Sequence, residues 1–493
     1  MMSLSNSIQK ILTAVLLFSV LLNAGCQKTD KKSELPKQPN VVYILVDDLG
    51  YGDLTAYGQQ TIKTPHLSRM ADEGMLFTDH YAGSTVCAPS RAALLTGKHT
   101  GNSSVRGNHP AQVQILADED VTVAEVFKQA GYKTANIGKW GVGHPIPNND
   151  PGRNGFDYFF GYLNMWHAHN YYPEFLYRNE EKVSLANKLK TDENGNNPWA
   201  DKPEGNGWSA ERTEYTPDLF EQESLKFIEQ NKDNPFFLMV TLTIPHANNE
   251  NLENGMEVPD YGSYVDKDWP EAEKGFAAML ERMDNTVGNI RAKLKELGLE
   301  ENTLVMFASD NGPHTEGGHD PDFFTSSGEC RGTKRDMYDG GIKIPFMAAW
   351  PGKIKAGTTT EHLSAFWDLL PTACDLTGQA APEDINGISF LPTLLGTGEQ
   401  REHDYLYWEF YEQGGKQAIR KDKWKAIKLN VRSSKQPVTF ELYDLTADVG
   451  EVNNVADQYP EVVEEMEKLF AEAHRPFSVT DLFSDKENLE VAF

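Results

Sequence analysis

The run Val41-Val42-Tyr43-Ile44-Leu45-Val46, which stops at Asp47-Asp48, decides the fold of this 493-residue chain. A second apolar run, Leu304-Val305-Met306-Phe307-Ala308, stops in the same way at Ser309-Asp310-Asn311-Gly312. Continuous apolar runs of this length indicate strands buried on both faces, which are typical of the parallel strands of an α/β sheet. Because ligands bind at the carboxyl ends of such strands, these acids are expected at a binding site. Clustered carboxylates repel one another, and a hard cation with oxygen ligands is the usual remedy.

Strand-like and helical segments alternate from Asn40 to about Ile388, which predicts a doubly wound α/β fold. The elements expected within it are strands over 132–138 and 236–242 and helices over 121–131 and 276–299. The Gly-, Asn- and Pro-rich stretch from Thr191 to Gly207 is expected to be an irregular surface insertion. After residue 388 the sequence pattern changes to shorter alternating segments. A small α+β subdomain is predicted from short strands over 405–408, 417–420 and 424–427 and a helix over 460–473.

The formal net charge of -27 and the pI near 4.9 argue against nucleic-acid binding. Hydrophobic residues at 39% and charged residues at 24% are typical of a soluble globular protein. The four cysteines, Cys26, Cys87, Cys330 and Cys374, are too few for a fold held together by disulfides. Whether Cys330 and Cys374 pair stays open.

The first 25 residues have the form of an export signal. Lys10 precedes an apolar run over 11–22, which is too short for a membrane span and matches the core of a secretory signal. The following Leu22-Asn23-Ala24-Gly25-Cys26 resembles a bacterial lipoprotein cleavage site, with Asn23 where an aliphatic residue is usual. We therefore expect Cys26 to be lipidated, residues 26–38 to form a flexible tether, and the chain to be a periplasmic or cell-surface lipoprotein of a bacterium. The alternative is an ordinary secreted protein without a lipid on Cys26.

Cys87-Ala88-Pro89-Ser90-Arg91 has the Cys-x-Pro-x-Arg pattern that resembles type I sulfatases, in the alkaline phosphatase-like superfamily. The resemblance covers nearly the whole mature chain, because other motifs fall in the family's order: Val46-Asp47-Asp48-Leu49-Gly50-Tyr51-Gly52-Asp53, Gly138-Lys139-Trp140, Pro245-His246, Asp310-Asn311-Gly312, Arg331-Gly332-Thr333-Lys334 and Gly340-Gly341-Ile342. It implies a catalytic domain over 39–388, with a mixed, largely parallel sheet sandwiched by helices, and a C-terminal α+β subdomain with an antiparallel sheet over 389–493. It also implies that a formylglycine-generating enzyme oxidises Cys87 to formylglycine (3-oxoalanine), whose hydrate attacks sulfur.

The residues around Cys87 make chemical sense on their own. Cys87 is expected at a helix start, because Pro89 sets the backbone there and the Ala92-Ala93-Leu94-Leu95 run continues the helix until Gly97. A nucleophile just before that terminus lies where free N–H groups and the helix dipole stabilise anions. The alternative for Cys87 is a buried small hydrophobic residue.

The acidic residues predict the metal. Asp47, Asp48, Asp310 and Asn311 offer oxygen only, which suits one Ca²⁺ and disfavours zinc. The resemblance adds the modified Cys87 side chain as a further ligand. It also implies that sulfate charge is neutralised by basic residues, namely Arg91, Lys139 and Lys334.

Histidines are the candidates for proton transfer. The resemblance implies that His246 contacts the sulfate ester and protonates the leaving sugar oxygen. Many sulfatases carry a histidine after Gly-Lys-Trp to help eliminate sulfate, but here that position is Gly141. The missing base could be His144, His167 or His169, and we favour His169. The alternative is that these histidines line the sugar subsite or are structural.

Gly141, the run 167–172 and the run 311–318 resemble bacterial exo-acting glycan sulfatases, particularly those that remove 4-O-sulfate from galactose or N-acetylgalactosamine. Substrate hydroxyls are expected to meet His167, His314, Glu316, Asp320 and Arg335, while Trp166, Tyr171 or Tyr172 stacks on the ring. Two other functions compete: a phosphomonoester or phosphonate hydrolase of the same superfamily, and a non-catalytic surface glycan-binding protein. Zinc phosphatases need histidine metal ligands, and a binding protein should have lost its catalytic residues, so a sulfatase is favoured.

Overall fold

The computed structural model describes residues 38–108, 115–142 and 150–476, all within the compact unit Lys37–Phe493. The expected signal peptide, the lipidated Cys26, the tether up to residue 37 and His144 lie outside the described residues. Among the residues that are described, no helix is long and apolar enough to cross a membrane. Cys87, Cys330 and Cys374 are free thiols, so the open question of a Cys330–Cys374 pair is answered in the negative.

Ten of the described strands form one sheet around β1 (Asn40–Asp47), which lies between β10 (Phe236–Pro245) and β11 (Thr303–Ser309) and parallel to both. β4 (Lys133–Lys139) continues the parallel part beyond β10, followed by β5 (Tyr158–Tyr162). The outer strands are mostly antiparallel: β12 (Phe346–Ala349), β2 (Met75–Phe77) and β13 (Thr358–Thr360) beyond β11, and β6 (Phe175–Arg178) and β7 (Glu181–Ser184) beyond β5. The prediction of a mixed, largely parallel sheet is confirmed.

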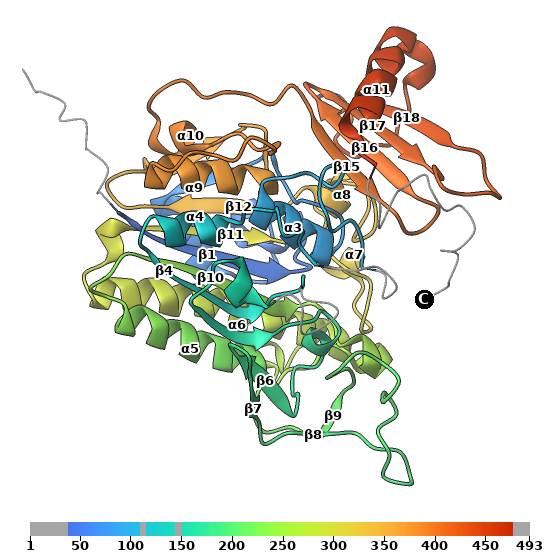
Figure 1. Ribbon diagram of the computed structural model, residues 1–493. Coiled ribbons are helices and arrows are strands. Elements are labelled where there is room, and N and C mark those ends of the chain that lie inside the picture. The colour runs from blue at the N-terminus through green and yellow to red at the C-terminus, as the bar shows by residue number, and fades with distance from the viewer. Residues whose placement is uncertain (1–37, 109–114, 143–149, 477–493) are drawn as a thin grey trace, which may run out of the picture. The chain divides into compact units, whose positions relative to one another are not determined.

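Helices cover both faces of the sheet, as Figure 1 shows. Below it in that view lie α5 (Thr216–Gln230) and α6 (Glu271–Glu296), with α2 (Pro65–Glu73) on the same face; the other face carries α3 (Cys87–Thr96), α4 (Val123–Gln129) and α9 (Leu369–Thr377). The apolar run of β1 serves both layers, because Val41, Tyr43 and Leu45 join one core and Val42, Ile44 and Val46 join the other. All six are at most 1% exposed, which explains why the run shows no polar alternation.

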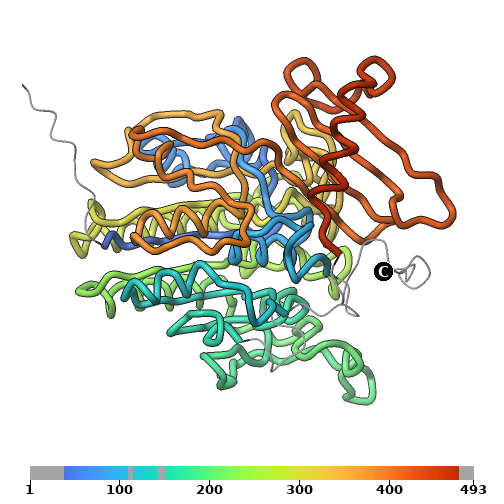
Figure 2. The backbone as a smooth tube through the Cα atoms, turned by 45° about the horizontal axis from the view of Figure 1, so that its top comes forward, coloured from blue at the N-terminus to red at the C-terminus, as the bar shows by residue number. Residues whose placement is uncertain are grey.

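The chain after residue 405 forms a separate four-stranded antiparallel sheet of β15 (Leu406–Phe410), β16 (Lys416–Lys421), β17 (Trp424–Leu429) and β18 (Thr439–Asp444). Helix α11 (Pro460–Ala473), red in Figure 2, lies across one face of it. Met466 and Phe470 of this helix share a hydrophobic cluster with the sheet. The other face packs on the large domain in a shared cluster that includes Tyr81, Trp367 and Trp408. The small α+β subdomain is therefore confirmed, whereas its boundary after residue 388 stays a prediction.

Buried charges also join the two parts. Lys425 on β17 is fully buried, and its Nζ lies 2.6 Å from Asp339 Oδ1 and 3.4 Å from Glu451 Oε1. Arg106 NH1 donates to Glu409 Oε1 on β15 at 2.9 Å. Such pairs require a fixed geometry, so they define how the subdomain sits on the large domain.

The expected insertion over 191–207 contains turns but neither helix nor strand, and the helix expected at 276 begins earlier, at Glu271. The remaining short elements are β3 (His80–Tyr81), β8 (Lys188–Leu189), β9 (Ser209–Glu211), β14 (Ser364–Ala365), α7 (Pro321–Phe324), α8 (Asp339–Ile342), α10 (Leu391–Leu395), η1 (Tyr51–Asp53), η2 (Thr55–Tyr57), η3 (Pro151–Asn154), η4 (His167–His169), η5 (Asn249–Asn254), η6 (Gly262–Tyr264), η7 (Glu300–Asn302), η8 (Phe366–Asp368) and η9 (Ala456–Gln458).

Candidate active site

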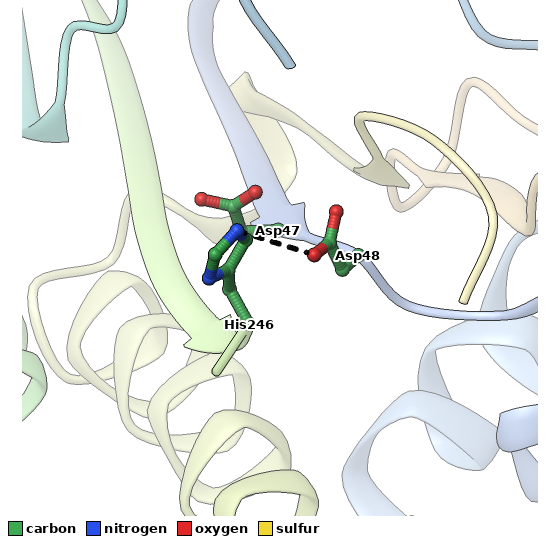
Figure 3. Close-up of side chains that lie close together, drawn as sticks. All are labelled: Asp47, Asp48 and His246. Atoms are coloured by element: carbon green, nitrogen blue, oxygen red, sulfur yellow. Dashed lines mark ion pairs between the residues drawn. The ribbon is translucent and has the colours of Figure 1, made fainter. Parts of the chain in front are cut away.

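The carboxyl ends of four neighbouring strands bring charged side chains together. Asp47 ends β1 and Asp48 follows it, Asp310 and Asn311 follow β11, His246 follows β10, and Lys139 ends β4. Figure 3 shows His246 beside the two aspartates, with its Nε2 3.4 Å from Asp48 Oδ2. The sequence-based expectation that the acids of β1 and β11 meet at one edge of the sheet matches this arrangement.

Each of the three carboxylates has its own basic partner. Lys139 Nζ lies 2.7 Å from Asp47 Oδ2, Lys334 Nζ lies 2.8 Å from Asp48 Oδ2, and Arg91 NH2 lies 2.8 Å from Asp310 Oδ2. All six side chains are at least 97% buried. The acids and bases of this cluster therefore balance in charge.

The surroundings of the three acids shift their pKa values in different directions. Burial alone would raise the pKa of Asp47 and of Asp48, but Lys139 near Asp47 and Lys334 near Asp48 hold both pKa values below the usual range. For Asp310, burial and then repulsion from Asp47 outweigh Arg91 and raise the pKa to about 7. An added positive charge would stabilise the ionised form of Asp310.

Two oxygen atoms at this edge are free to bind a cation. Asp47 Oδ1 and Asn311 Oδ1 are buried and have no hydrogen-bond partner among the described residues. Asn311 Nδ2 donates to Asp48 Oδ1 at 2.7 Å, and Asp48 N donates to Asp310 Oδ1 at 3.2 Å, which ties the four residues into one unit. Asp48 has a left-handed backbone with φ 65°, a strained conformation of the kind that clusters at ligand clamps. An oxygen-only set with unpaired buried oxygens fits Ca²⁺.

The structure also brings histidines close to these acids. The ligand atoms of Asp47, Asp48 and His246 lie within 4.8 Å of one another, as do those of Asp48, His314 and Glu316. However, His246 Nδ1 faces Ala247 O at 2.5 Å and its Nε2 faces Lys334 Nζ at 3.0 Å. Histidine nitrogens engaged in this way would have to give up protein partners to bind zinc.

His314 is engaged in the same manner. Its Nδ1 accepts a hydrogen bond from Glu316 N at 3.0 Å, and its Nε2 lies 3.1 Å from Pro245 O. The oxygen atoms, not the histidine nitrogens, are therefore the free ligands at this edge.

Cys87 is the first residue of α3, as the sequence predicts, and the helix ends before Gly97. Its Sγ accepts a hydrogen bond from Asn108 Nδ2 at 3.1 Å, while Asn108 Oδ1 accepts one from Ala88 N at 3.0 Å. Burial raises the pKa of the Cys87 thiol. Asn108 was missed by the sequence reasoning because it belongs to none of the motifs.

A side chain at Gly141 would be strained in this backbone. Its φ of 82° lies in the left-handed region, and a Cβ would come within 2.9 Å of Arg91 Cδ. Arg91 itself is held by Asp310 and by Lys139 O, which its NH1 reaches at 2.7 Å. Many sulfatases have a histidine at this position, but here a histidine at residue 141 would clash with Arg91 and strain the backbone.

A cavity of about 520 Å³ opens beside Cys87. The sequence-predicted residues that line it are Cys87, Trp166, His169, His246, Lys334 and Arg335. Its other lining residues include Asn108, Trp199, Asn206, Glu250 and Glu412, which no motif singled out. Trp199 and Asn206 belong to the insertion, so a segment expected to be only surface forms part of the wall.

Other sequence-predicted sugar contacts lie elsewhere. The His167 ring is fully buried against Tyr162 and Phe175, with ring centroids 4.9 and 4.6 Å away. Asp320 is exposed and accepts a hydrogen bond from Asp322 N at the start of α7. The structure thus brings neither His167 nor Asp320 to the cavity, because one fills the core and the other caps a helix.

His314 and Glu316 also do not line the cavity directly. His314 is buried beneath His246, with ring centroids 5.9 Å apart, and Glu316 accepts from Lys334 at 3.0 Å and from Arg335 at 2.6 Å. Tyr171, expected to stack on a sugar, is buried with its hydroxyl on the carbonyls of Thr243 and His246. Tyr172 packs against Tyr215.

Comparison with known proteins identifies the family of this chain. Residues 39–379 match the model of the Sulfatase family, and residues 331–475 match that of N-sulphoglucosamine sulphohydrolase, C-terminal. An N-acetylgalactosamine-6-O-sulfatase of Bacteroides thetaiotaomicron is 31% identical over 92% of this chain and 97% of its own length. Human N-acetylgalactosamine-6-sulfatase is 32% identical over 74% of this chain and 67% of its own length. Both relatives are named for position 6, whereas the sequence features were matched to 4-O-sulfatases.

Solved structures agree in fold. One from Bacteroides thetaiotaomicron, described with the metabolism of multiple glycosaminoglycans, has a TM-score of 0.73 at 27% identity and covers 89% of this chain and 100% of its own. Ps i-CgsB in complex with k-i-k-neocarrahexaose has a TM-score of 0.72 at 25% identity and covers 89% of this chain and 94% of its own. The family match over most of the chain and the sulfatase relatives establish that the protein belongs to the sulfatase family and is a sulfuric ester hydrolase.

Proposed function

We propose that the protein removes 6-O-sulfate from N-acetylgalactosamine or galactose at the ends of sulfated glycan chains. The observation that carries this proposal is the 520 Å³ cavity that joins Cys87, His246 and Lys334, a volume suited to a sugar-sized ligand. The two N-acetylgalactosamine-6-sulfatase relatives support the sugar and the position. Removal of 4-O-sulfate, suggested by the sequence features, is the runner-up.

In this proposal the oxygen atoms of Asp47, Asp48, Asp310 and Asn311 hold one Ca²⁺, with the formylglycine made from Cys87 as a further ligand. Bound calcium would supply positive charge to the sulfate oxygens, and the hydrate of the formylglycine aldehyde would supply the nucleophilic hydroxyl. The orphaned Asp47 Oδ1 and Asn311 Oδ1 support the metal, and the position of Cys87 at the N-terminus of α3 supports the nucleophile.

Lys334 and His246 form the proton-donating pair of the proposal. Burial and then Lys334 lower the pKa of His246 to about 3, so the imidazole is neutral at physiological pH. Burial alone would lower the pKa of Lys334, but Asp48 and Glu316 raise it above its usual value, so Nζ holds its protons. Lys334 Nζ lies 3.0 Å from His246 Nε2 and both residues line the cavity, so this pair is proposed to supply the proton to the leaving sugar oxygen.

Arg91 and Lys139 are proposed to orient the acids of the cluster. Their hydrogen bonds go to Asp310, Asp47 and the carbonyl of Lys139, so they fix the orientation of the acids. His169 is proposed to take the base role that Gly141 cannot provide, because it lines the same cavity as Cys87. Arg335, held by Glu316, lines the same cavity and is proposed to contact the substrate.

Maturation and localisation complete the proposal. A formylglycine-generating enzyme acts on Cys87, and the export signal and lipidated Cys26 anchor the protein at the periplasmic side or cell surface of a bacterium. Incorporation of labelled fatty acid by the full chain, and its loss in Cys26→Ser, would test the anchor.

The central experiment uses protein co-expressed with a formylglycine-generating enzyme. Mass spectrometry of the tryptic peptide 70–91 first verifies that residue 87 has lost its sulfur. The protein is then assayed on N-acetylgalactosamine carrying sulfate at position 6 or at position 4, on galactose 6-sulfate, and on a sugar phosphate. We expect the fastest release of sulfate from a 6-sulfated sugar. Preference for the 4-sulfate would reverse the assigned position, and turnover of the phosphate alone would overturn the substrate class.

A further inference from the structure

Three side chains from separate segments meet in the wall of the cavity. His169 ends η4, Glu250 lies in η5, and Asn206 belongs to the insertion. His169 Nδ1 lies 3.3 Å from Glu250 Oε2 and 3.5 Å from its Oε1, and Asn206 Nδ2 donates to Glu250 Oε1 at 2.9 Å. The His169 ring also stacks on His246, with centroids 4.7 Å apart and an angle of 16° between the planes.

The contact with Glu250 determines which ring nitrogen of a neutral His169 carries the proton. Burial alone would raise the pKa of Glu250, but His169 and the hydrogen bonds around the carboxyl hold it below its usual value. An ionised carboxylate can only accept hydrogen bonds, so the proton of a neutral His169 sits on Nδ1. Its Nε2 then carries the lone pair, and no hydrogen bond joins Nε2 to any residue in the described ranges.

We propose that Glu250 is a positioning residue for the sulfatase reaction: it holds His169 with Nδ1–H toward its carboxylate and Nε2 free toward the cavity, while Asn206 fixes Glu250. The inference rests on the proposed role of His169 as a base. Nothing in the sequence motifs marks Glu250, which lies three residues past Ala247 in an Asn-rich segment.

Replacement of Glu250 by glutamine gives a sharp test of this arrangement. In Glu250→Gln the side-chain oxygen keeps its hydrogen bond from Asn206, and the amide NH₂ takes the place of Oε2 beside His169. An NH₂ group donates, so His169 Nδ1 becomes the acceptor and the ring proton moves to Nε2. The shape of the site is preserved, but the base is in the wrong tautomer.

The kinetic experiment uses matured enzyme and an aryl sulfate, so that it does not depend on the sugar. General acid–base groups contribute on the order of 10²–10⁴-fold, so we expect Glu250→Gln to lower kcat by about 100-fold or more, with KM changed by less than about 3-fold. Glu253→Gln, an exposed glutamate in the same η5 segment, is the matched control and should leave both constants unchanged.

A double-mutant cycle separates positioning from a structural effect. If Glu250 acts through His169, Glu250→Gln should lower kcat by no more than about 2-fold in a His169→Ala background. An equal loss in both backgrounds, or a rise in KM with kcat retained, would overturn the inference. Failure on every sulfated sugar with the aryl sulfate still hydrolysed would instead overturn only the proposed substrate.

A second readout does not involve turnover. Protein with unmodified Cys87 and ¹⁵N-labelled histidine rings should show His169 Nε2, assigned by its loss in His169→Ala, in the unprotonated range of nitrogen shifts. In Glu250→Gln that signal should move to the protonated range. If His169 Nε2 carries a proton in the wild type, or is unaffected in Glu250→Gln, the inference is wrong.

Discussion

Replacing Lys425 by methionine should destabilise the protein strongly and more so at high pH. The Lys425 ammonium is fully buried between Asp339 Oδ1 at 2.6 Å and Glu451 Oε1 at 3.4 Å. Methionine keeps the length and apolar bulk of the side chain, so the substitution removes the charge with little change in packing. Two buried carboxylates then lose their shared cation.

The size of the stability loss depends on the partners that Asp339 and Glu451 keep. Asp339 keeps the Tyr81 hydroxyl at 2.9 Å, and Glu451 keeps the Asp339 N–H at 2.6 Å, but neither donor carries a charge. Breaking a buried ion pair by removing one partner costs about 3–5 kcal/mol. A surface pair is worth about 0–1 kcal/mol, so Lys423→Met, in the turn before β17, is the matched control because it removes a half-exposed partner of Asp444.

The pH dependence has a definite sign. Burial already raises the pKa of Glu451 from 4.5 to about 7 although Lys425 opposes the shift, and removal of Lys425 raises it further. A carboxyl whose folded-state pKa lies above its unfolded value destabilises the fold as pH rises from the unfolded pKa through the folded one. The free energy lost in Lys425→Met should therefore be larger at pH 8 than at pH 5.

Urea unfolding followed by tryptophan fluorescence at both pH values measures this difference. Trp408 and Trp424 lie on the affected sheet, so the probe reports on it directly. A loss below about 1 kcal/mol at pH 8 would contradict the cost of breaking a buried pair. A loss at pH 5 equal to that at pH 8 would contradict the linkage argument.

Three further predictions concern the active site. Cys87→Ala should abolish sulfate release. The circular dichroism spectrum should stay that of the wild type, because a small side chain fits the buried start of α3. Full activity in this variant would show that Cys87 is not the nucleophile. Chelation should lower both activity and Tm, and added calcium but not zinc should restore them, with a stabilisation of about 2.7 kcal/mol when calcium is at 100 times its Kd; recovery by zinc alone would show that the oxygen atoms are not the ligands. Gly141→His should not restore a base but should cost about 1–3 kcal/mol in thermal unfolding, because its backbone is left-handed and Arg91 blocks the Cβ; an active, stable variant would show that the site relaxes easily.

The sequence predicts the centre of the molecule well because the centre is governed by local patterns. The apolar run of residues 41–46 has no polar alternation, and this follows from burial in two cores at once. The same pattern in residues 304–308 placed Asp310 and Asn311 next to Asp47 and Asp48. The helix over 460–473 was bounded correctly by Pro460 and its apolar stripe.

The walls of the cavity were not predictable in the same way. Trp199, Asn206 and Glu250 reach it from irregular segments whose paths depend on long-range contacts, such as the Glu204 hydrogen bonds with Tyr177 and Lys182. His167 and His169 are only two residues apart, yet one fills the core and the other lines the cavity. The spacing of two residues on a short 3-10 turn does not reveal which of them faces the cavity.

The pairing of Asp47, Asp48 and Asp310 with Lys139, Lys334 and Arg91 has a consequence for how ligands enter. When Asp310 is ionised these six charges cancel, so a divalent cation arriving alone leaves a buried excess of positive charge, and an anionic ester arriving alone leaves the opposite excess. Bound together, the two largely compensate each other. Metal and anion affinities should thus be coupled, and thermodynamic reciprocity requires that each strengthens the other by the same factor. Free sulfate, the product, would then strengthen metal binding for as long as it occupies the site.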